Sequence, residues 1–408
     1  MTEHTNTPEL RFPEFKDEWK LQKLGNLAQF SKGKSLSKKD LNINGNPCIL
    51  YGELYTKYGA ILNKVYSKTS TQNDSLVFSK RNQILIPSSG ETDIDIATAT
   101  AIDTDVKIAI GGDLNIITPI NSDGRFISLY INGKGKYNLA KYAQGKSVVH
   151  LYNSDIKKLN FYLPTNMAEQ KKVGDFFSKL DCQIELEEKK LELLEQQKKG
   201  YIQKIFSQEL RFKDENGNNY PNWEMKKLGN IANIVGGGTP STKKSEYWDG
   251  DINWFSPVEI GDKEFVSTSQ RRITEKGLEK SSAKVLPIGT VLFTSRAGIG
   301  KTAILSKEAT TNQGFQSIVP KENDLDSYFL YSMTSILKRN AEKVGAGSTF
   351  SEVSRKQMEQ IKLLIPILKE QKQIGRLFQI INRKINKQIH KIELLKQRKK
   401  GLLQKMFV

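Results

Sequence analysis

Two stretches of the chain repeat apolar residues at alternating spacings of four and three. The first runs from Glu169 to about Ser207, and the second follows 201 residues later. Heptads sustained over this length predict two long helices that pair as a coiled coil. Eight of the ten seam positions in each stretch are apolar, and the two polar positions coincide. The predicted seam residues are Phe177, Leu180, Ile184, Leu191, Leu194, Phe378, Ile381, Ile385, Ile392 and Leu395.

A proline precedes each predicted helix, at Pro164 and Pro366, and limits helix upstream of it. Asn166 lies three residues before Glu169, which predicts a capping box at the start of the first helix. At about 38 residues, each helix would extend roughly 57 Å at 1.5 Å per residue.

The helices belong to a repeat that spans the whole chain. The segment 19–28 returns at 223–232, and the segment 195–206 returns at 396–407. A period near 200 residues indicates two duplicated domains and not a solenoid. Between the matched ends, segments 30–145 and 236–345 diverge strongly. We therefore expect a shared frame with two different functional surfaces.

The N-terminal tail completes this repeat. Glu9–Phe12 matches Glu209–Phe212, which follows the first helix, whereas no such piece follows the second helix. The pattern predicts a circular, pseudo-twofold arrangement, with the two helices antiparallel and the termini close together.

Short strand-like runs separated by Gly, Ser, Asn and Asp predict an α+β fold in each half. Two globular α/β domains would then be joined by the two antiparallel coiled-coil helices. The predicted division is a tail over 1–18, a domain over 19–165, a helix over 166–210, a connector over 211–222, a domain over 223–366 and a helix over 367–408.

The net charge of +18 indicates a polyanionic partner, most simply nucleic acid. The alternative is a basic protein kept soluble by its charge. Residues 366–408 carry twelve Lys or Arg against two Glu, and these side chains face DNA phosphates, a partner or solvent. Two separated cysteines and three scattered histidines argue against a disulfide framework or a metal site. With neither an apolar signal core nor a transmembrane run, we expect a cytoplasmic protein without a membrane partner.

Basic, hydroxyl, amide and aromatic side chains in turn segments are candidates for DNA contact, because such groups bind phosphates and base edges. In the first half they are Lys32, Lys34, Lys38, Lys39, Tyr51, Lys57, Tyr58, Ser88 and Ser89. In the second half they are Thr239, Ser241, Lys243, Lys244, Ser295, Arg296, Asn312, Gln313 and Thr349. A plain exposed loop is the alternative reading for any one of them.

The sequence offers no convincing catalytic constellation. Residues 295–302 end like a phosphate-binding loop, but Ser295 replaces the first glycine and a strand-like run follows. We find no Asn-Pro-Pro-aromatic or Asp-Pro-Pro-aromatic run, no helicase set, no nuclease cluster and no Ser/His/Asp arrangement. The chain is therefore expected to be a reader and not an enzyme.

Several motifs occur in a fixed order and are mostly duplicated. They are the Trp19 and Trp223 segments with Leu-Gly-Asn, the Gly-Gly-Gly-Thr-Pro loop at 236–240, the Glu-Gln-Lys helix starts at 169–171 and 370–372, and the Lys-Lys-Gly helix ends. By the order and duplication of these motifs, the chain resembles, over essentially its whole length, the specificity subunits of type I restriction–modification systems. The first domain departs from the pattern, since it has Ser31–Ser35 in place of the glycine loop.

The resemblance implies two domains that each read half of a split double-stranded DNA site, with the helices setting the unread spacer. It also implies partners, namely two methylation subunits and restriction subunits with translocase and nuclease activity. Those partners would use S-adenosylmethionine, ATP and Mg, and no cofactor would bind this chain. Two alternatives remain: a coiled-coil nucleic-acid-binding scaffold or regulator without modification partners, and a hydrolase or nuclease with an unrecognised site.

Overall fold

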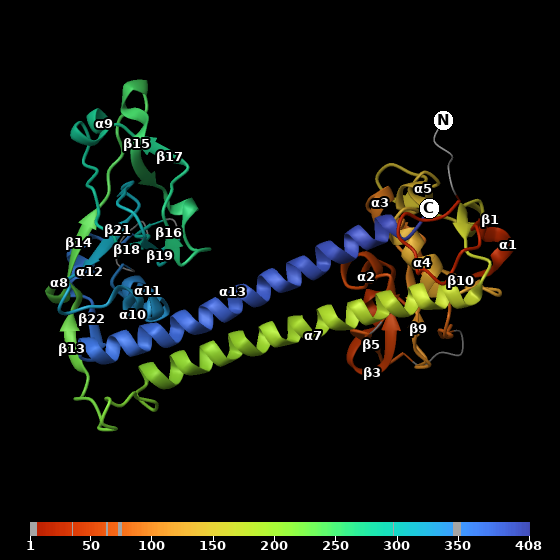
Figure 1. Cartoon of the computed structure of the whole chain (residues 1–408), viewed down its shortest axis with the longest axis horizontal. Coiled ribbons are helices and arrows are strands. Elements are labelled where there is room, and N and C mark those ends of the chain that lie inside the picture. The colour runs from red at the N-terminus through yellow and green to blue at the C-terminus, as the bar shows by residue number, and fades with distance from the viewer. Residues whose placement is uncertain (1–5, 35, 63, 72–75, 297, 346–351) are drawn as a thin grey trace. The chain divides into compact units, whose positions relative to one another are not determined.

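The computed structural model describes residues 6–34, 36–62, 64–71, 76–296, 298–345 and 352–408. The chain forms two compact units. The first unit comprises Met1–Lys190 and Gln388–Val408, and the second comprises Leu191–Lys387. Each unit holds one globular domain and about half of each long helix (Figure 1).

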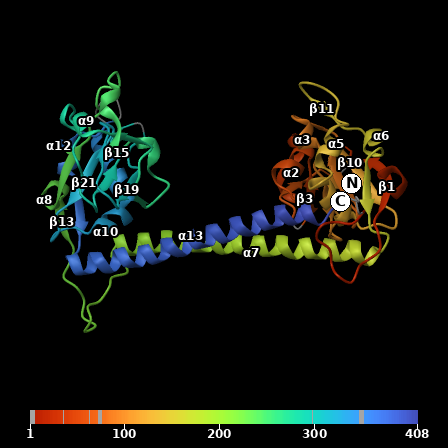
Figure 2. The ribbon, with the colours of Figure 1, turned by 45° about the horizontal axis from the view of Figure 1, so that its top comes forward.

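The two predicted long helices are present as α7, Met167–Phe206, and α13, Leu368–Lys405. In the first unit the beginning of α7 packs against the end of α13, and Figure 2 shows the same pairing from a second side. In the second unit the end of α7 packs against the beginning of α13. The helices are therefore antiparallel in each unit, as the repeat predicted. Phe177 and Phe378 are at most 1% exposed, and Leu191, Leu194 and Leu395 are the half-buried seam residues.

The predicted capping box at the start of α7 is wrong. Asn166 Oδ1 accepts a hydrogen bond from the Ala168 N–H at 2.9 Å, but the Glu169 side chain does not reach back to the cap. Its carboxylate instead accepts from Arg11 and from Trp19 Nε1, because Glu169 is 1% exposed and faces the domain.

The first unit contains three kinds of sheet. Its five-stranded sheet has the order β2-β10-β6-β8-β4, with β4 and β8 parallel. A three-stranded sheet has the order β5-β3-β9, and β1-β12 and β11-β7 are two-stranded. The strands are β1 Lys20–Lys23, β2 Ala28–Lys32, β3 Leu41–Ile49, β4 Ile61–Leu62, β5 Ser67–Thr69, β6 Ile84–Pro87, β7 Ser89–Gly90, β8 Thr100–Ile102, β9 Ala109–Ile110, β10 Leu114–Pro119, β11 Val149–His150 and β12 Asn160–Leu163.

Short helices complete the first domain. They are α1 Leu24–Leu27, η1 Lys38–Asp40, α2 Tyr51–Thr56, α3 Asp93–Ile96, α4 Gly124–Asn132, α5 Lys136–Ala140 and α6 Asn153–Ile156. Helix α4 is the most apolar of them, with Phe126, Ile127, Leu129 and Ile131 fully buried. These side chains join the core that also receives the beginning of α7.

The second unit repeats the five-stranded sheet, the three-stranded sheet and one two-stranded sheet, β13-β22. Its five-stranded sheet has the order β14-β21-β18-β19-β16, and its three-stranded sheet has the order β17-β15-β20. The strands are β13 Glu224–Lys227, β14 Ala232–Gly236, β15 Trp248–Phe255, β16 Phe265–Val266, β17 Arg271–Ile273, β18 Val291–Phe293, β19 Thr302–Leu305, β20 Thr310–Thr311, β21 Gln316–Pro320 and β22 Lys362–Ile365. The short helices are α8 Leu228–Ile231, η2 Ser245–Tyr247, η3 Pro257–Glu259, α9 Glu275–Glu279, α10 Ser327–Ser332, α11 Thr334–Gly345 and α12 Arg355–Gln360.

The two domains thus share one fold despite their divergent middles. Strands β2, β10, β6, β8 and β4 correspond in order to β14, β21, β18, β19 and β16. Even the unusual parallel pairs recur, β4 with β8 and β16 with β19. The predicted α+β class is confirmed. The two domains therefore build a common framework from different residues, in their buried clusters as well as in their loops.

The junction between each domain and its helix pair is built twice from the same contacts. Arg11 and Trp19 donate to Glu169 in the first unit, and Arg211 and Trp223 donate to Glu370 in the second. All of these polar groups lie at the edge of an aromatic cluster. Phe407 packs beside Trp19, Phe126 and Phe177, whereas Phe206 packs beside Trp223, Phe329 and Phe378.

The tail closes the repeat as predicted. The Leu10 N–H donates to the Lys405 carbonyl at 2.9 Å, and the Leu210 N–H donates to the Lys204 carbonyl at the same distance. The N-terminal segment therefore lies against the end of α13 in the first unit, just as the segment after α7 lies against the end of α7 in the second unit.

Candidate nucleic-acid interface

The glycine loop of the second unit is shaped by close packing. A Cβ on Gly237 would lie 2.0 Å from the Asn312 carbonyl oxygen, and one on Gly238 would lie 2.3 Å from Ser282 Oγ. The Gly238 N–H donates to the Thr311 carbonyl at 2.8 Å. These glycines are therefore required by the protein's own backbone contacts, which hold the following segment, 239–244, at the edge of the sheet.

Several predicted residues of the second unit meet around the turn 312–314. Thr239 Oγ1 donates to Gln313 Oε1, and the Ser295 N–H donates to the Gly314 carbonyl at 2.8 Å. Asn312 Oδ1 accepts from the Gly314 N–H, so this part of its amide is engaged in shaping the turn. Gln313 is exposed, and Arg296, which follows Ser295 in the chain, is half-buried. The arrangement gathers amide, hydroxyl and guanidinium groups, which are the groups that read base edges.

A second group forms next to the exposed loop that carries Ser241 and Lys243. Lys244 Nζ lies 5.2 Å from the centre of the Tyr247 ring and donates to the Tyr247 hydroxyl. The Arg271 guanidinium stacks 3.6 Å from the centre of the Trp248 ring. Sequence analysis missed Arg271. Its position beside two tryptophans depends on the pairing of β15 with β17, which no local pattern reveals.

In the first unit Lys32 ends β2 and Lys34 follows it, while Ser88 and Ser89 follow β6, and both of these strands pair with β10. The Lys34 N–H donates to the Ile110 carbonyl at 3.2 Å. This bond corresponds to the bond from the Gly238 N–H to the Thr311 carbonyl in the second unit. The Ser88 N–H donates to the Asp113 carbonyl, and Ser89 pairs with His150. Lys32 Nζ lies 5.8 Å from the Tyr152 ring, another residue that sequence analysis missed. The two domains therefore place unlike side chains at equivalent points of one backbone.

The other candidates of the first unit lie in two different places. Lys38 and Lys39 are exposed in η1, just before the β3 hairpin, whose residue Ile43 is 90% exposed. Lys57 is ion-paired with Glu53, and Tyr58 accepts a hydrogen bond from the Tyr66 N–H. Burial raises the pKa of Tyr58 to about 12. Tyr58 and Lys57 border a cavity that is also lined by Asp181 of α7, so they face the helices.

The serines among the candidates differ in how far they are buried. Ser88 is 7% exposed and Ser295 is 0% exposed, whereas Ser241 is exposed. Tyr51 is half-buried at the start of α2. Thr349 lies outside the described residues. DNA contact by these candidates stays a prediction.

Basic residues of the second helix partly neutralise acids of the first. In the first unit, ion pairs join Lys391 to Glu187, Lys396 to Glu188 and Lys399 to Asp181. Gln388 Nε2 also donates to Glu187 Oε2 at 2.7 Å, so the coinciding polar seam positions bond to each other. These hydrogen bonds hold the pKa of Glu187 below its usual range.

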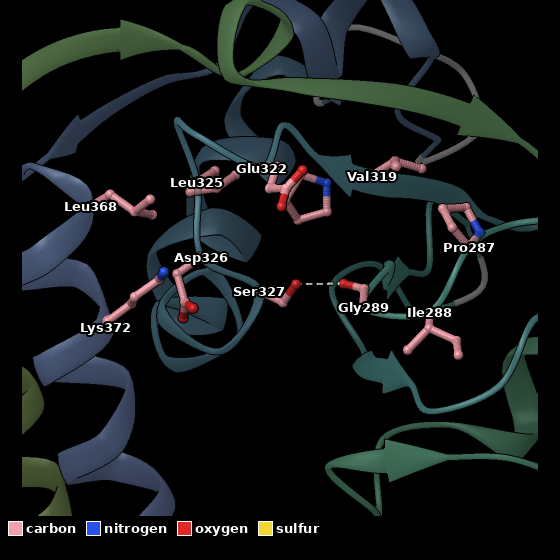
Figure 3. A pocket seen from close by; sticks show the side chains of 11 residues that line it. Pro287, Ile288, Gly289, Val319, Glu322, Leu325, Asp326, Ser327, Leu368 and Lys372 are labelled. Atoms are coloured by element: carbon pink, nitrogen blue, oxygen red, sulfur yellow. Dashed lines mark hydrogen bonds between the residues drawn. The ribbon is translucent and has the colours of Figure 1, made fainter.

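The cavities lie apart from most of these residues. One of about 320 Å³ lies between the β18 side of the second domain and the start of α13, and no predicted DNA-contacting residue lines it (Figure 3). Its hydroxyl group, Ser327 Oγ, already donates to the Gly289 carbonyl at 2.6 Å. Within the described ranges, no cluster of His, Cys, Asp and Glu side chains could hold a metal ion. Among these same residues, no helix has both the length and the apolar character needed to cross a membrane.

Comparison with known families identifies both halves. The sequence model of the type I restriction modification DNA specificity domain matches residues 16–196 and again residues 220–396. The MjaIX specificity subunit of Methanocaldococcus jannaschii is 37% identical over 174 residues, which is 42% of this chain and 40% of that protein. The EcoR124I/EcoR124II specificity subunit of Escherichia coli is 35% identical over 159 residues, which is 37% of this chain and 39% of that protein. The chain thus spans about two fifths of the length of these two relatives.

Solved structures of low sequence identity show the same fold along the whole chain. The type I restriction-modification S subunit from M. genitalium has a TM-score of 0.64 at 17% identity, covering 98% of this chain and 99% of that one. A chain from a study of complex assembly in a type I R-M system has a TM-score of 0.54 at 16% identity, covering 94% of this chain and 96% of that one.

Proposed function

The chain belongs to the type I restriction–modification DNA specificity family, with two copies of the specificity domain, and we propose that each copy reads one half of a bipartite DNA site. In this proposal the chain is a non-catalytic subunit that selects the sequence, and partner subunits carry out the chemistry. The observation that carries the proposal is the combination of one repeated framework with different side chains at its loop positions.

The side chains at the two loop clusters support different half-sites. The second unit presents Gln313, Thr239 and Arg296 around one turn, while the first presents Lys32 and Lys34 at the corresponding place. Amides and guanidinium groups discriminate bases, whereas lysines hold phosphates. A net charge of +18 supplies the salt-sensitive part of the affinity. The two halves of the site are therefore expected to differ in sequence.

Two methylation subunits are the proposed partners of the helices. Leu186 and Leu394 in the first unit are 59% and 51% exposed, and Leu193 in the second is 64% exposed. Leu193 and Leu394 are equivalent in the repeat, 201 residues apart. Large exposed side chains of this kind on otherwise charged helices fit a partner surface. One equivalent position on each helix fits two copies of the partner.

The remaining partners follow from the same proposal. Methylation subunits would use S-adenosylmethionine to modify adenine, and restriction subunits would use ATP and Mg for translocation and cleavage in the cytoplasm. The helices would fix the number of unread base pairs between the two half-sites.

The test is genome-wide mapping of methylated adenines in cells that express this chain with its methylation subunits. A split motif that depends on the chain is the expected result. Arg296→Ala is expected to reduce methylation through the second half-site more than through the first, and an equal loss at both would contradict that assignment. A soluble complex that creates no new methylated motif would favour a nucleic-acid-binding scaffold without modification partners.

A further inference from the structure

The repeat places a lysine at the same seam position of each long helix, but only one of them is neutralised. In the first unit, Lys399 forms an ion pair with Asp181, and the two side chains are 19% and 14% exposed. Lys198 is the equivalent lysine in the second unit, 201 residues earlier than Lys399. The residue equivalent to Asp181 is Asn382, so an uncharged amide replaces the carboxylate.

The surroundings of Lys198 do not replace this carboxylate. Asn382 Nδ2 donates to the Tyr328 hydroxyl at 3.0 Å, and that hydroxyl donates to Glu264 at 2.6 Å. Glu264 is thus engaged by Tyr328, and Lys198 forms no ion pair with any residue that the structure describes. Burial lowers the pKa of Lys198, and the more distant charges of Glu264 and Glu195 offset only part of this effect.

Lys198 lines a cavity of about 470 Å³ between the helix pair and the second domain. Lys301 and Lys338 line the same cavity, and Asp262 is the acidic residue on its wall. The Thr302 and Thr334 hydroxyls on the wall lie 2.8 Å apart. Lys338 has a carboxylate partner, Glu342, but at 3.9 Å and on an exposed surface. The wall of the cavity therefore carries three lysines, of which Lys198 is half-buried and Lys301 and Lys338 are exposed, and one acid.

We propose that this cavity binds a phosphate group through Lys198, Lys301 and Lys338. Lysine binds phosphate as a point charge, and an anion offsets the cost of keeping a charged lysine away from water. The phosphate belongs either to the DNA backbone or to a free phosphate ligand. Only the first source rests on the proposed function.

The binding mode differs from that of a nucleotide-binding P-loop, although Lys301 and Thr302 end a P-loop-like sequence. The Gly300 N–H donates to the Thr294 carbonyl, and the Lys301 N–H donates to Thr294 Oγ1. These backbone donors are used within the turn, and Thr302 begins strand β19 where a P-loop begins a helix. Side chains are therefore the donors for the proposed phosphate.

Two substitutions in the full chain test the proposal. Lys198→Gln removes the central charge, and Asn382→Asp supplies the carboxylate that the first unit has as Asp181. Lys399→Gln is the matched control, because it makes the same change where the lysine is already paired. Melting curves of each variant check that the chain is folded.

Inorganic phosphate is the first probe, titrated into the full chain by calorimetry. We expect Lys198→Gln and Asn382→Asp to weaken phosphate binding at least tenfold and Lys399→Gln to leave it unchanged. This result assigns the cavity to a free phosphate group, and it stands even if the chain reads no DNA sequence.

The second arm measures the DNA affinity of the chain with its methylation subunits as a function of salt. If DNA supplies the phosphate, Lys198→Gln lowers the slope of log affinity against log salt by about 1, whether or not inorganic phosphate binds. The methylated motif stays the same, which separates this outcome from a failure of the proposed function. An unchanged slope together with no phosphate binding by the unsubstituted chain overturns the proposal.

Discussion

The junction between tail and helix allows a quantitative test, because its central carboxylate is buried. Arg11 Nε lies 2.6 Å from Glu169 Oε1 and Arg11 Nη2 lies 2.8 Å from Oε2. The side chains of Arg11 and Glu169 are 13% and 2% exposed. In Arg11→Ala, the Glu169 carboxylate would lose its cationic partner and keep the Trp19 Nε1–H, at 3.2 Å, as a neutral donor. Leaving a buried charge in this state costs about 3–5 kcal/mol.

Native-state hydrogen exchange measures this loss unit by unit. We expect the free energy of opening for amides of β12 and α4, in the first unit, to fall by about 3–5 kcal/mol in Arg11→Ala. Amides of the second unit should keep their protection. The equivalent substitution, Arg211→Ala, should produce the mirror result, because Arg211 binds Glu370 in the same way.

A neighbouring exposed ion pair provides the control. Glu9 and Lys405 join the same tail to α13, but their side chains are 69% and 56% exposed. Glu9→Gln should therefore cost between 0 and about 1 kcal/mol. The reasoning is refuted if Arg11→Ala changes the opening free energy no more than Glu9→Gln does, or if both units lose protection equally.

Three further predictions concern the DNA interface, the partner surface and pH. Arg271→Ala should weaken binding of the second half-site by about 1–3 kcal/mol in fluorescence anisotropy titrations. Lys276→Ala, which changes an exposed lysine nearby in the chain, is the control, and equal effects of the two substitutions would exclude a specific contact by Arg271. Leu193→Asp should prevent assembly with methylation subunits, measured by co-purification, while the melting temperature stays the same; normal assembly would contradict the proposed partner surface. Glu187 has a lowered folded pKa, so its contribution to stability is present above the unfolded pKa, about 4.3, and is lost as pH falls through the folded value. Glu187→Gln should therefore show a smaller loss of melting temperature between pH 6 and pH 3, and an identical loss would disprove this role.

The long helices and their repeat could be predicted because both signals are local or periodic. The heptad seam is visible in the sequence because apolar residues such as Phe177, Leu180 and Ile184 follow one another at spacings of three and four. Recognising this pattern requires no knowledge of the rest of the fold. The return of Glu9–Phe12 at 209–212 likewise predicted the closing contact between tail and α13. These features depend on order along the chain alone.

The sheets could be predicted only as a class. Strands β4, β9, β16 and β20 have two residues each, too short for an alternation to show. Their parallel partners come from distant parts of the chain, so register and order depend on tertiary packing. Arg271 was missed for this reason, since its ring contact with Trp248 arises only when β17 pairs with β15.

The burial of Ser88 and Ser295 shows a related limit. Both follow an apolar strand, where a serine is typical of an exposed turn, and both have main-chain hydrogen bonds to a neighbouring segment. These bonds draw the strand ends inward, to 7% and 0% exposure. From the sequence alone, a serine in an exposed turn and a serine at a buried strand end look the same, because the difference depends on which segment lies beside them.

A second pair of equivalent main-chain bonds explains how one framework accommodates two unlike surfaces. The segment after β2 is held by the Lys34 N–H on the Ile110 carbonyl, and the segment after β14 by the Gly238 N–H on the Thr311 carbonyl. Both bonds use backbone atoms alone, so the first domain can place a lysine at the point where close packing against Ser282 requires a glycine in the second. Some side-chain contacts recur in both domains, among them those of Glu169 and Glu370 at the junctions with the helices. Residues at the loop positions can thereby differ between the domains without loss of the fold, as the proposed reading of two different half-sites requires.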